Sequence, residues 1–252
     1  MKPLFSLLPL VLFSATVLPL TAQNPDPVQA AAAKAFADRQ DAAVKLTVTR
    51  KVKSKDQTFE ISAVSLDGKD LLVTSLSQVE SGSKGLLGGL MMMEGEGDEG
   101  GPPVMGKAEK GELTRVAILR ADATEAEADL VLTDAALDLA FIRVRPIDGV
   151  AVALPAASPQ AQAAPALLDN VLATLRKGPE FQRAASAELL QIAALITTPR
   201  AFYIPSQPLP GGTAVYNLSG ELLGIATQVH NESVIVPVAA IAKLAATIPA
   251  KQ

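Results

Sequence analysis

The feature that most constrains the fold is a series of short segments with alternating apolar and polar residues, between Val44 and Pro237. VKLTVTRKV and TFEISAVSL show the period-two alternation of strands with one buried face. Similar strand-like segments follow, separated by turn residues: DLLVTSL, TRVAILRA, EADLVL, DLAFIRV, DNVLATLRK, RAFYIP, GTAVYNL, ELLGIATQV and SVIVP. AELLQIAALIT is of uncertain type. The helical segments that a parallel βαβ arrangement requires are lacking, so we expect an all-β protein of two small antiparallel barrels or sandwiches.

Helical patterns are confined to the two ends of the chain. In residues 23–43, an alanine-rich segment follows Asp26, a candidate N-cap, and Pro27 at the first helical position. VAAIAKLAATI, near the other end, has apolar residues at helical spacing. The Pro/Ala-rich residues 155–166 are the best candidate for a domain boundary. We expect the first barrel at residues 44–154, this linker at 155–166, and the second barrel with the carboxy-terminal helix at 167–252.

The amino-terminal residues have the pattern of a secretory signal peptide. Lys2 supplies a basic start, residues 4–20 are almost all apolar, and Ala22 is a small residue at a plausible cleavage site. Two prolines interrupt the apolar run, which favours a cleaved signal over the alternative, a retained membrane helix. We therefore expect residues 1–22 to be removed. The remaining chain would be periplasmic or extracellular, without stable membrane insertion.

Composition excludes several classes of function. The chain has no Cys, which rules out disulfides, thiol catalysis and Cys-ligated metals, and its single His, His230, cannot form a His-rich metal site. The net charge of −4 and a pI near 5.2 give no support for nucleic-acid binding, which depends on neutralising phosphates. Global disorder is excluded as well, because the 49% hydrophobic content is ample for a folded core.

Residues 82–110 interrupt the strand pattern. Gly, Pro and acidic residues dominate and no periodicity survives, so we expect a flexible insertion in the first barrel. Two kinds of metal site are the alternatives: Met thioethers that bind Cu(I), and carboxylates that bind Ca²⁺. Neither set of residues has the spacing of a metal site, so we expect no metal and no cofactor. Clustered Leu and Met side chains favour an adaptable contact surface instead. The residues concerned are Met91, Met92, Met93 and Met105 for Cu(I), Glu94, Glu96, Asp98 and Glu99 for Ca²⁺, and Leu86, Leu87 and Leu90 to Met93 for contacts.

Several segments, in order, resemble trypsin-like serine proteases, particularly the bacterial HtrA type. LVTSLSQV at 72–79 resembles LVTNAHVV of the family, and DAALDLAFIRV at 134–144 resembles D-x-x-x-D-L-A-L-L-K-V. GGTAVYNLSGELLGI at 211–225 resembles SGGPVFNLDGELVGI, and VIVP at 234–237 is similar to the FAIP that precedes the family's last helix. The resemblance implies two antiparallel six-stranded barrels, with the catalytic positions at their interface.

The resemblance assigns the family's three catalytic positions to residues of this chain. Ser77 stands at the base position, Asp138 at the orienting carboxylate, and Gly211 at the nucleophile, or Pro210 if the alignment shifts by one residue. A serine hydroxyl is no general base near neutral pH, and neither Gly nor Pro has a hydroxyl to act as nucleophile. The resemblance thus implies a degenerate triad and no catalytic residues. Our favoured interpretation of Asp138 is that it caps local backbone N–H groups at a strand start, and the alternative is a leftover triad carboxylate.

Two functions remain open. The first is an exported, proteolytically inactive domain that binds an unknown peptide or envelope protein, or serves as a scaffold. The second is an active serine endopeptidase with a rearranged triad that recruits Ser206 or Thr213 with His230, although we expect His230 to lie in a surface turn. Binding is expected in a cleft near Leu209, Pro210, Gly211, Gly212 and Thr213.

Overall fold

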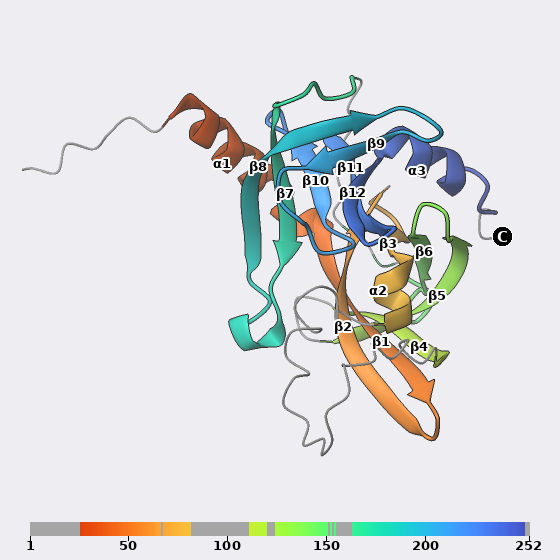
Figure 1. Ribbon diagram of the computed structural model, residues 1–252. Helices are drawn as coiled ribbons and strands as arrows, with labels where there is room; N and C mark the ends of the chain where they lie inside the picture. Colours follow the sequence, from red (N-terminus) through yellow and green to blue (C-terminus); the bar gives the residue numbers. More distant parts are fainter. Residues whose placement is uncertain are drawn as a thin grey trace, which may run out of the picture.

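The computed structural model describes residues 26–66, 68–81, 111–119, 124–150, 152, 154 and 163–249. Within them, the strands form two closed antiparallel barrels of six strands each, which confirms the all-β prediction (Figure 1). The predicted signal peptide (1–22), the insertion (82–110) and residues 155–162 of the predicted linker lie outside the described residues.

The first barrel closes in the strand order β1-β2-β3-β6-β5-β4. Alternation places apolar side chains such as Leu46, Ile61 and Ile142 inside, where each is at most 1% exposed. Lys45 and Ser62, on the opposite face of the β1–β2 pair, are direct cross-strand neighbours. The strands are β1 (Ala43–Val52), β2 (Lys55–Ser65), β3 (Leu71–Ser75), β4 (Glu112–Leu119), β5 (Glu125–Asp134) and β6 (Leu139–Val144).

The second barrel closes in the order β10-β11-β12-β9-β8-β7 and lies above the first in Figure 1. The segment of uncertain type, AELLQIAALIT, is the larger part of strand β8. Its Leu190 and Ile192 point into the barrel core, while Leu189 and Leu195 are each 41% exposed. The strands are β7 (Asn170–Arg176), β8 (Ala185–Ile196), β9 (Phe202–Pro205), β10 (Ala214–Asn217), β11 (Leu222–Val229) and β12 (Glu232–Pro237).

An apolar cluster joins the two barrels. Phe141 of the first barrel and Tyr216 of the second belong to it, and both are fully buried. Burying a side chain as large as phenylalanine stabilises a fold by about 1.5–3 kcal/mol, so the barrels form one packed unit. Helix α1 (Pro27–Arg39) contributes Ala32 and Ala35 to this cluster, and helix α3 (Val238–Ala245) contributes Val238 and Ile241.

The terminal helices form where the sequence predicts them. The Asp26 side chain accepts a hydrogen bond from Val28 N–H at 2.9 Å, and Pro27 opens helix α1. A short helix, α2 (Leu76–Ser81), was not predicted. It directly follows β3, and its first N–H, on Leu76, donates to the backbone carbonyl of Asp138 at 2.9 Å.

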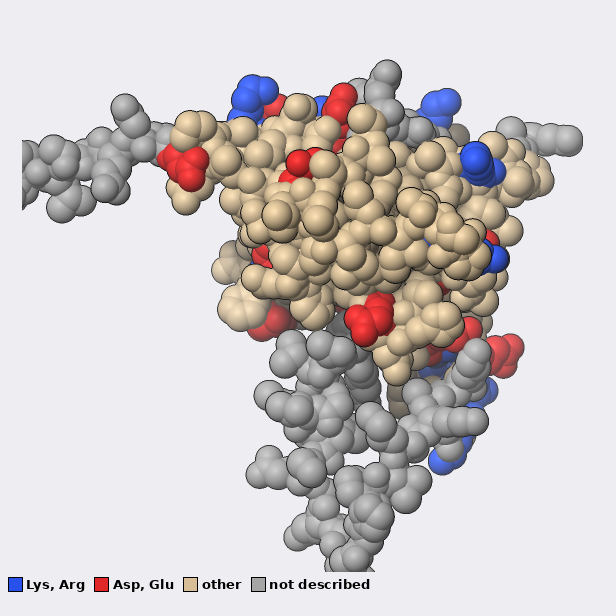
Figure 2. All heavy atoms as spheres, turned by 45° about the horizontal axis from the view of Figure 1, so that its top comes forward, with Lys and Arg blue, Asp and Glu red and all other residues tan. Residues whose placement is uncertain are grey.

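The face of the second barrel around β8 differs from the barrel interface in its surface chemistry. Figure 2 shows this side of the molecule as a largely uncharged surface, with Lys and Arg at its margins and a few Asp and Glu side chains within it. Exposed apolar side chains contribute to it, among them Leu189, Leu195 and Ile196. The cleft between the barrels, described below, is instead lined by charged and polar side chains together with apolar ones.

Arg50 binds the chain on both sides of the predicted insertion. The residue is 9% exposed, and its guanidinium donates to the backbone carbonyls of Glu80 and Gly111. These carbonyls belong to the last turn of α2 and to the residue before β4. The two ends of segment 82–110 are therefore held side by side by contacts that do not involve the segment itself.

Replacing residues 82–110 by a short Gly/Ser linker is therefore expected to change the melting temperature by less than about 8 °C. The free energy of loop closure depends only weakly on loop length, and Arg50 already holds the ends together. Differential scanning calorimetry measures the change. A larger fall would mean that the insertion packs on a barrel. Arg50→Leu in the shortened chain should lower the melting temperature further, because two partly buried carbonyls lose their donor.

Candidate functional site

Asp138 lies at the barrel interface, at the start of β6. Its carboxylate is buried and accepts four hydrogen bonds: from Ser75 Oγ at 2.5 Å, Ser77 N at 2.6 Å, Ser77 Oγ at 3.1 Å and Gln228 N at 2.9 Å. Ser75 and Ser77 belong to the first barrel, whereas Gln228 is on β11 of the second. One carboxylate thus ties the β3–α2 junction to the second barrel.

The interpretation of Asp138 as a local backbone cap is wrong. Its N–H donors lie 61 and 90 residues away along the chain. The local capping role belongs to Asp134, whose Oδ1 accepts from Ala136 N at 2.9 Å and Leu137 N at 3.0 Å. Asp138 itself has a positive φ of 54°, a conformation that Asp and Asn adopt more readily than most residues. Asp138 thus combines a left-handed backbone conformation at the start of β6 with a carboxylate that binds segments distant in sequence.

Gly211 packs directly against the segment that carries Ser75 and Gln78. A Cβ atom at position 211 would lie 2.6 Å from Ser75 Cβ and 2.8 Å from Gln78 Cγ, where carbon atoms normally stay about 3.5–4.0 Å apart. Only a residue without a side chain fits this approach. The structure therefore brings Ser77, Asp138 and Gly211 into one cluster, in which position 211, rather than Pro210, meets the β3–α2 junction.

Gly212 also requires glycine. Its φ is +77°, and a Cβ atom there would lie 2.1 Å from the carbonyl oxygen of Ser62. Its N–H donates to Ala226 O at 2.8 Å. The two glycines thus let the loop before β10 lie directly on strands of the first barrel.

The loop before position 211 has few backbone N–H groups to offer a ligand. Leu209 N donates to Ser233 Oγ at 2.9 Å, and Pro210 has no N–H. Stabilising an oxyanion requires N–H groups that are free to point at the reacting oxygen. With these two positions excluded, the loop lacks the paired donors of an oxyanion site.

The comparisons with known proteins bear on the fold. No protein-family model and no curated protein matches the chain. Among solved structures, the chain is similar to an HtrA-type protease, a variant of AlgW with a tripeptide, with a TM-score of 0.56 over 86% of this chain at 16% identity. The fold is the trypsin-like double barrel. This chain spans 62% of the length of that protease chain, and likeness at this identity establishes the fold alone.

A cleft of about 650 Å³ runs between the two trypsin-like barrels. The first barrel contributes residues of β1 and β2 together with Gln78, Leu119 and Glu125. The second contributes residues 175–180, Arg183, Pro210 and Gly211. Of the five residues near which a binding cleft is expected, Pro210 and Gly211 line this cleft. The neighbouring Leu209, Gly212 and Thr213 are buried: Leu209 in the second barrel's core, Gly212 against Ser62, and Thr213 with its hydroxyl donating to Pro210 O at 2.7 Å.

The structure does not bring together the residues of a rearranged triad. His230 is exposed in the tight β11–β12 turn, where it and Asn231 both have positive φ. The Ser206 hydroxyl accepts from Gln191 N at 3.1 Å, and Thr213 is fully buried. Within the described ranges, no hydrogen bond links His230 to either hydroxyl.

Sequence reasoning missed several residues of this site. Ser75 and Gln78 were not singled out, although they close the space beside Gly211. Lys45 and Ser62 were treated only as polar positions of strands. Alternation shows that such residues leave the barrel core, but it does not show that a second barrel covers them.

Among the described residues, no three or more Asp, Glu or His side chains are placed to hold a metal ion. The Met and acidic candidates of 82–110 lie outside this part of the chain. No helix in the described ranges is long and apolar enough to cross a membrane.

Proposed function

We propose that the chain is an exported, proteolytically inactive trypsin-like domain whose interbarrel cleft binds a peptide or a segment of an envelope protein. The observation that carries the proposal is the packing of Gly211 on Ser75, which leaves no room for a nucleophile side chain. The base position supports it as well, because Ser77 has no imidazole and its hydroxyl and N–H are both bound to Asp138.

The cleft itself supports a binding role. Its volume lies within the range of about 300–1,000 Å³ that is common for ligand sites. Residues of both barrels line the cleft, so a bound segment would contact both barrels. A pure scaffold role, the other form of this proposal, would not need an open cleft of this size.

The purified chain is expected to show no serine-peptidase turnover and no labelling by a fluorophosphonate probe. Without base and nucleophile, only the small residual rate from binding remains. Casein hydrolysis and probe labelling are the two measurements, with trypsin as the positive control. Hydrolysis that a serine-directed inhibitor abolishes would establish the alternative, an active endopeptidase with a rearranged triad. Ser206→Ala, Thr213→Ala and His230→Ala would then identify the recruited groups.

Export is part of the same proposal and rests on the signal-peptide pattern of residues 1–22. Intact-mass measurement of the chain isolated from an exporting host should give a protein that begins at Gln23. A chain that keeps Met1 and stays with the membrane fraction would contradict it.

A further inference from the structure

Lys45 stands apart from the other charged side chains of the cleft. Its Nζ donates to Ser62 Oγ at 3.3 Å, a long hydrogen bond, and the side chain is half-buried. Ser62 and Gln78, which line the same cleft, are 7% and 8% exposed. The ammonium group therefore lies beside the most deeply buried polar groups of the cleft rather than at its rim.

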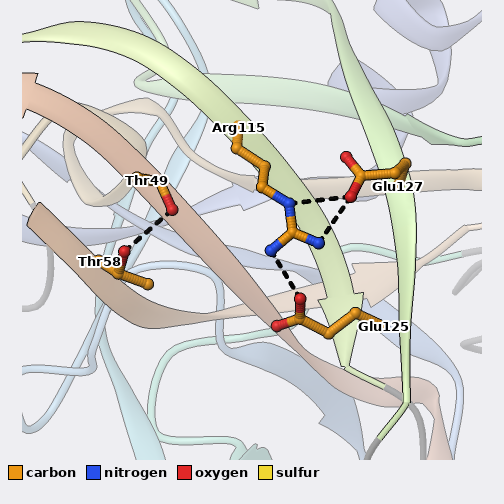
Figure 3. A network of polar contacts seen from close by, with 5 residues as sticks. All are labelled: Thr49, Thr58, Arg115, Glu125 and Glu127. Atoms are coloured by element: carbon orange, nitrogen blue, oxygen red, sulfur yellow. Dashed lines mark hydrogen bonds and ion pairs between the residues drawn. The ribbon is translucent and has the colours of Figure 1, made fainter. Parts of the chain in front are cut away.

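The carboxylates that line the cleft already have cationic partners or stay out of ion-pair range of Lys45. Glu60 is paired with Arg183, with an Nη2–Oε1 distance of 2.6 Å. Glu125 is bound by Arg115 at 2.6 Å, as Figure 3 shows, and the hydrogen bond from Arg115 holds the pKa of Glu125 below its usual value. Glu180 is exposed and acts on Lys45 only at longer range.

Lys45 thus has no ion-pair partner among the residues that the structure describes. Burial lowers the pKa of Lys45, an effect that Glu60 and Glu180 oppose and Arg183 adds to. A partly desolvated ammonium that no carboxylate contacts directly is unfavourable, and an incoming anion would offset that cost.

We propose that Lys45, Ser62 and Gln78 form a subsite for a single carboxylate of a bound peptide. This inference rests on the proposed peptide-binding function and names the chemistry that the cleft selects. The Lys45 ammonium would pair with the carboxylate. The Ser62 hydroxyl accepts from Lys45 and so keeps its own proton to donate, and Gln78 supplies an amide group.

An anion in this subsite would meet charges of both signs. Glu60 and Glu180 lie close enough to affect Lys45, and so does Arg183. Gly211 and Gln78 line the same cleft, so a peptide bound there would lie beside both residues. The carboxylate has two possible sources, a Glu or Asp side chain or a chain's carboxy terminus.

Four synthetic peptides separate these possibilities. Ac-AAEAA-amide and Ac-AAQAA-amide differ only in an internal carboxylate, and Ac-AAAAA with a free or an amidated carboxy terminus differ only in the terminal one. Titration of the ¹⁵N-labelled mature chain by NMR gives each affinity, with the amides of Gln78 and Gly211 as reporters. At least one carboxylate peptide should bind about tenfold more tightly than its neutral counterpart.

Lys45→Met is expected to abolish this preference, and Lys45→Arg to keep most of it. Lys177→Met is the matched control, because Lys177 lines the same cleft but is exposed, and it should change the preference less than about twofold. Equal binding of charged and neutral peptides, or equal effects of Lys45→Met and Lys177→Met, would overturn the subsite and leave peptide binding standing. Failure of all four peptides to bind would overturn both.

Discussion

Asp138→Ala is expected to lower the free energy of unfolding by about 3 kcal/mol. The carboxylate accepts four hydrogen bonds in a buried position, and its removal leaves the Ser77 and Gln228 N–H groups without an acceptor. For a domain of this size the melting temperature should fall by about 6–12 °C. Urea unfolding followed by circular dichroism measures the change.

Two variants show which part of Asp138 matters. Asp138→Asn keeps an oxygen that accepts from Ser77 N, and Asn tolerates the positive φ. The serine hydroxyls can rotate to donate or to accept, so the hydrogen bond from Gln228 N is the main contact that is lost. Its destabilisation should be smaller, about 1–2 kcal/mol. Asp134→Ala, which removes only a local cap, should cost about 1 kcal/mol. If Asp138→Ala costs no more than Asp134→Ala, the carboxylate does not tie the barrels together.

The double change Ser77→His plus Gly211→Ser is expected to destabilise the fold and to produce no peptidase. The new Cβ atom at position 211 would lie 2.6 Å from Ser75 Cβ, and overpacking of this kind costs about 1–3 kcal/mol. The new hydroxyl would also face a loop in which Leu209 N is engaged and Pro210 has no N–H. Casein hydrolysis by the double variant would contradict the closed nucleophile position.

Controls for position 211 come from the same chain. Gly178→Ala is the matched control, since its Cβ would meet only the carboxylate end of Glu180, a flexible side chain that can move away. It should change the unfolding free energy by less than about 0.5 kcal/mol. Ser75→Gly removes the closest obstacle to Gly211→Ala. The double variant Ser75→Gly plus Gly211→Ala should therefore lose less unfolding free energy than the sum of the two single variants.

The sequence by itself determined most of the strands, the terminal helices and the class of fold. Alternation marks a strand because successive side chains point to opposite faces, and burial along β5 and β8 follows this rule, whereas β3 and β7 are apolar runs buried on both faces. Asp26 and Pro27 start α1 by equally local chemistry. The resemblance of three segments to trypsin-like proteases supplied the closure into two six-stranded barrels, which alternation alone left open between barrels and sandwiches.

Only the tertiary structure decided the chemistry of the interface. The first N–H of helix α2, on Leu76, donates to the backbone carbonyl of Asp138, a residue distant in sequence. The acceptors and donors of Asp138, the exclusion of a side chain at Gly211 and the partial burial of Lys45 all depend on the second barrel or on strands distant in sequence. Local patterns say which residues leave a core, but the neighbours those residues then meet are set by packing between segments far apart along the chain.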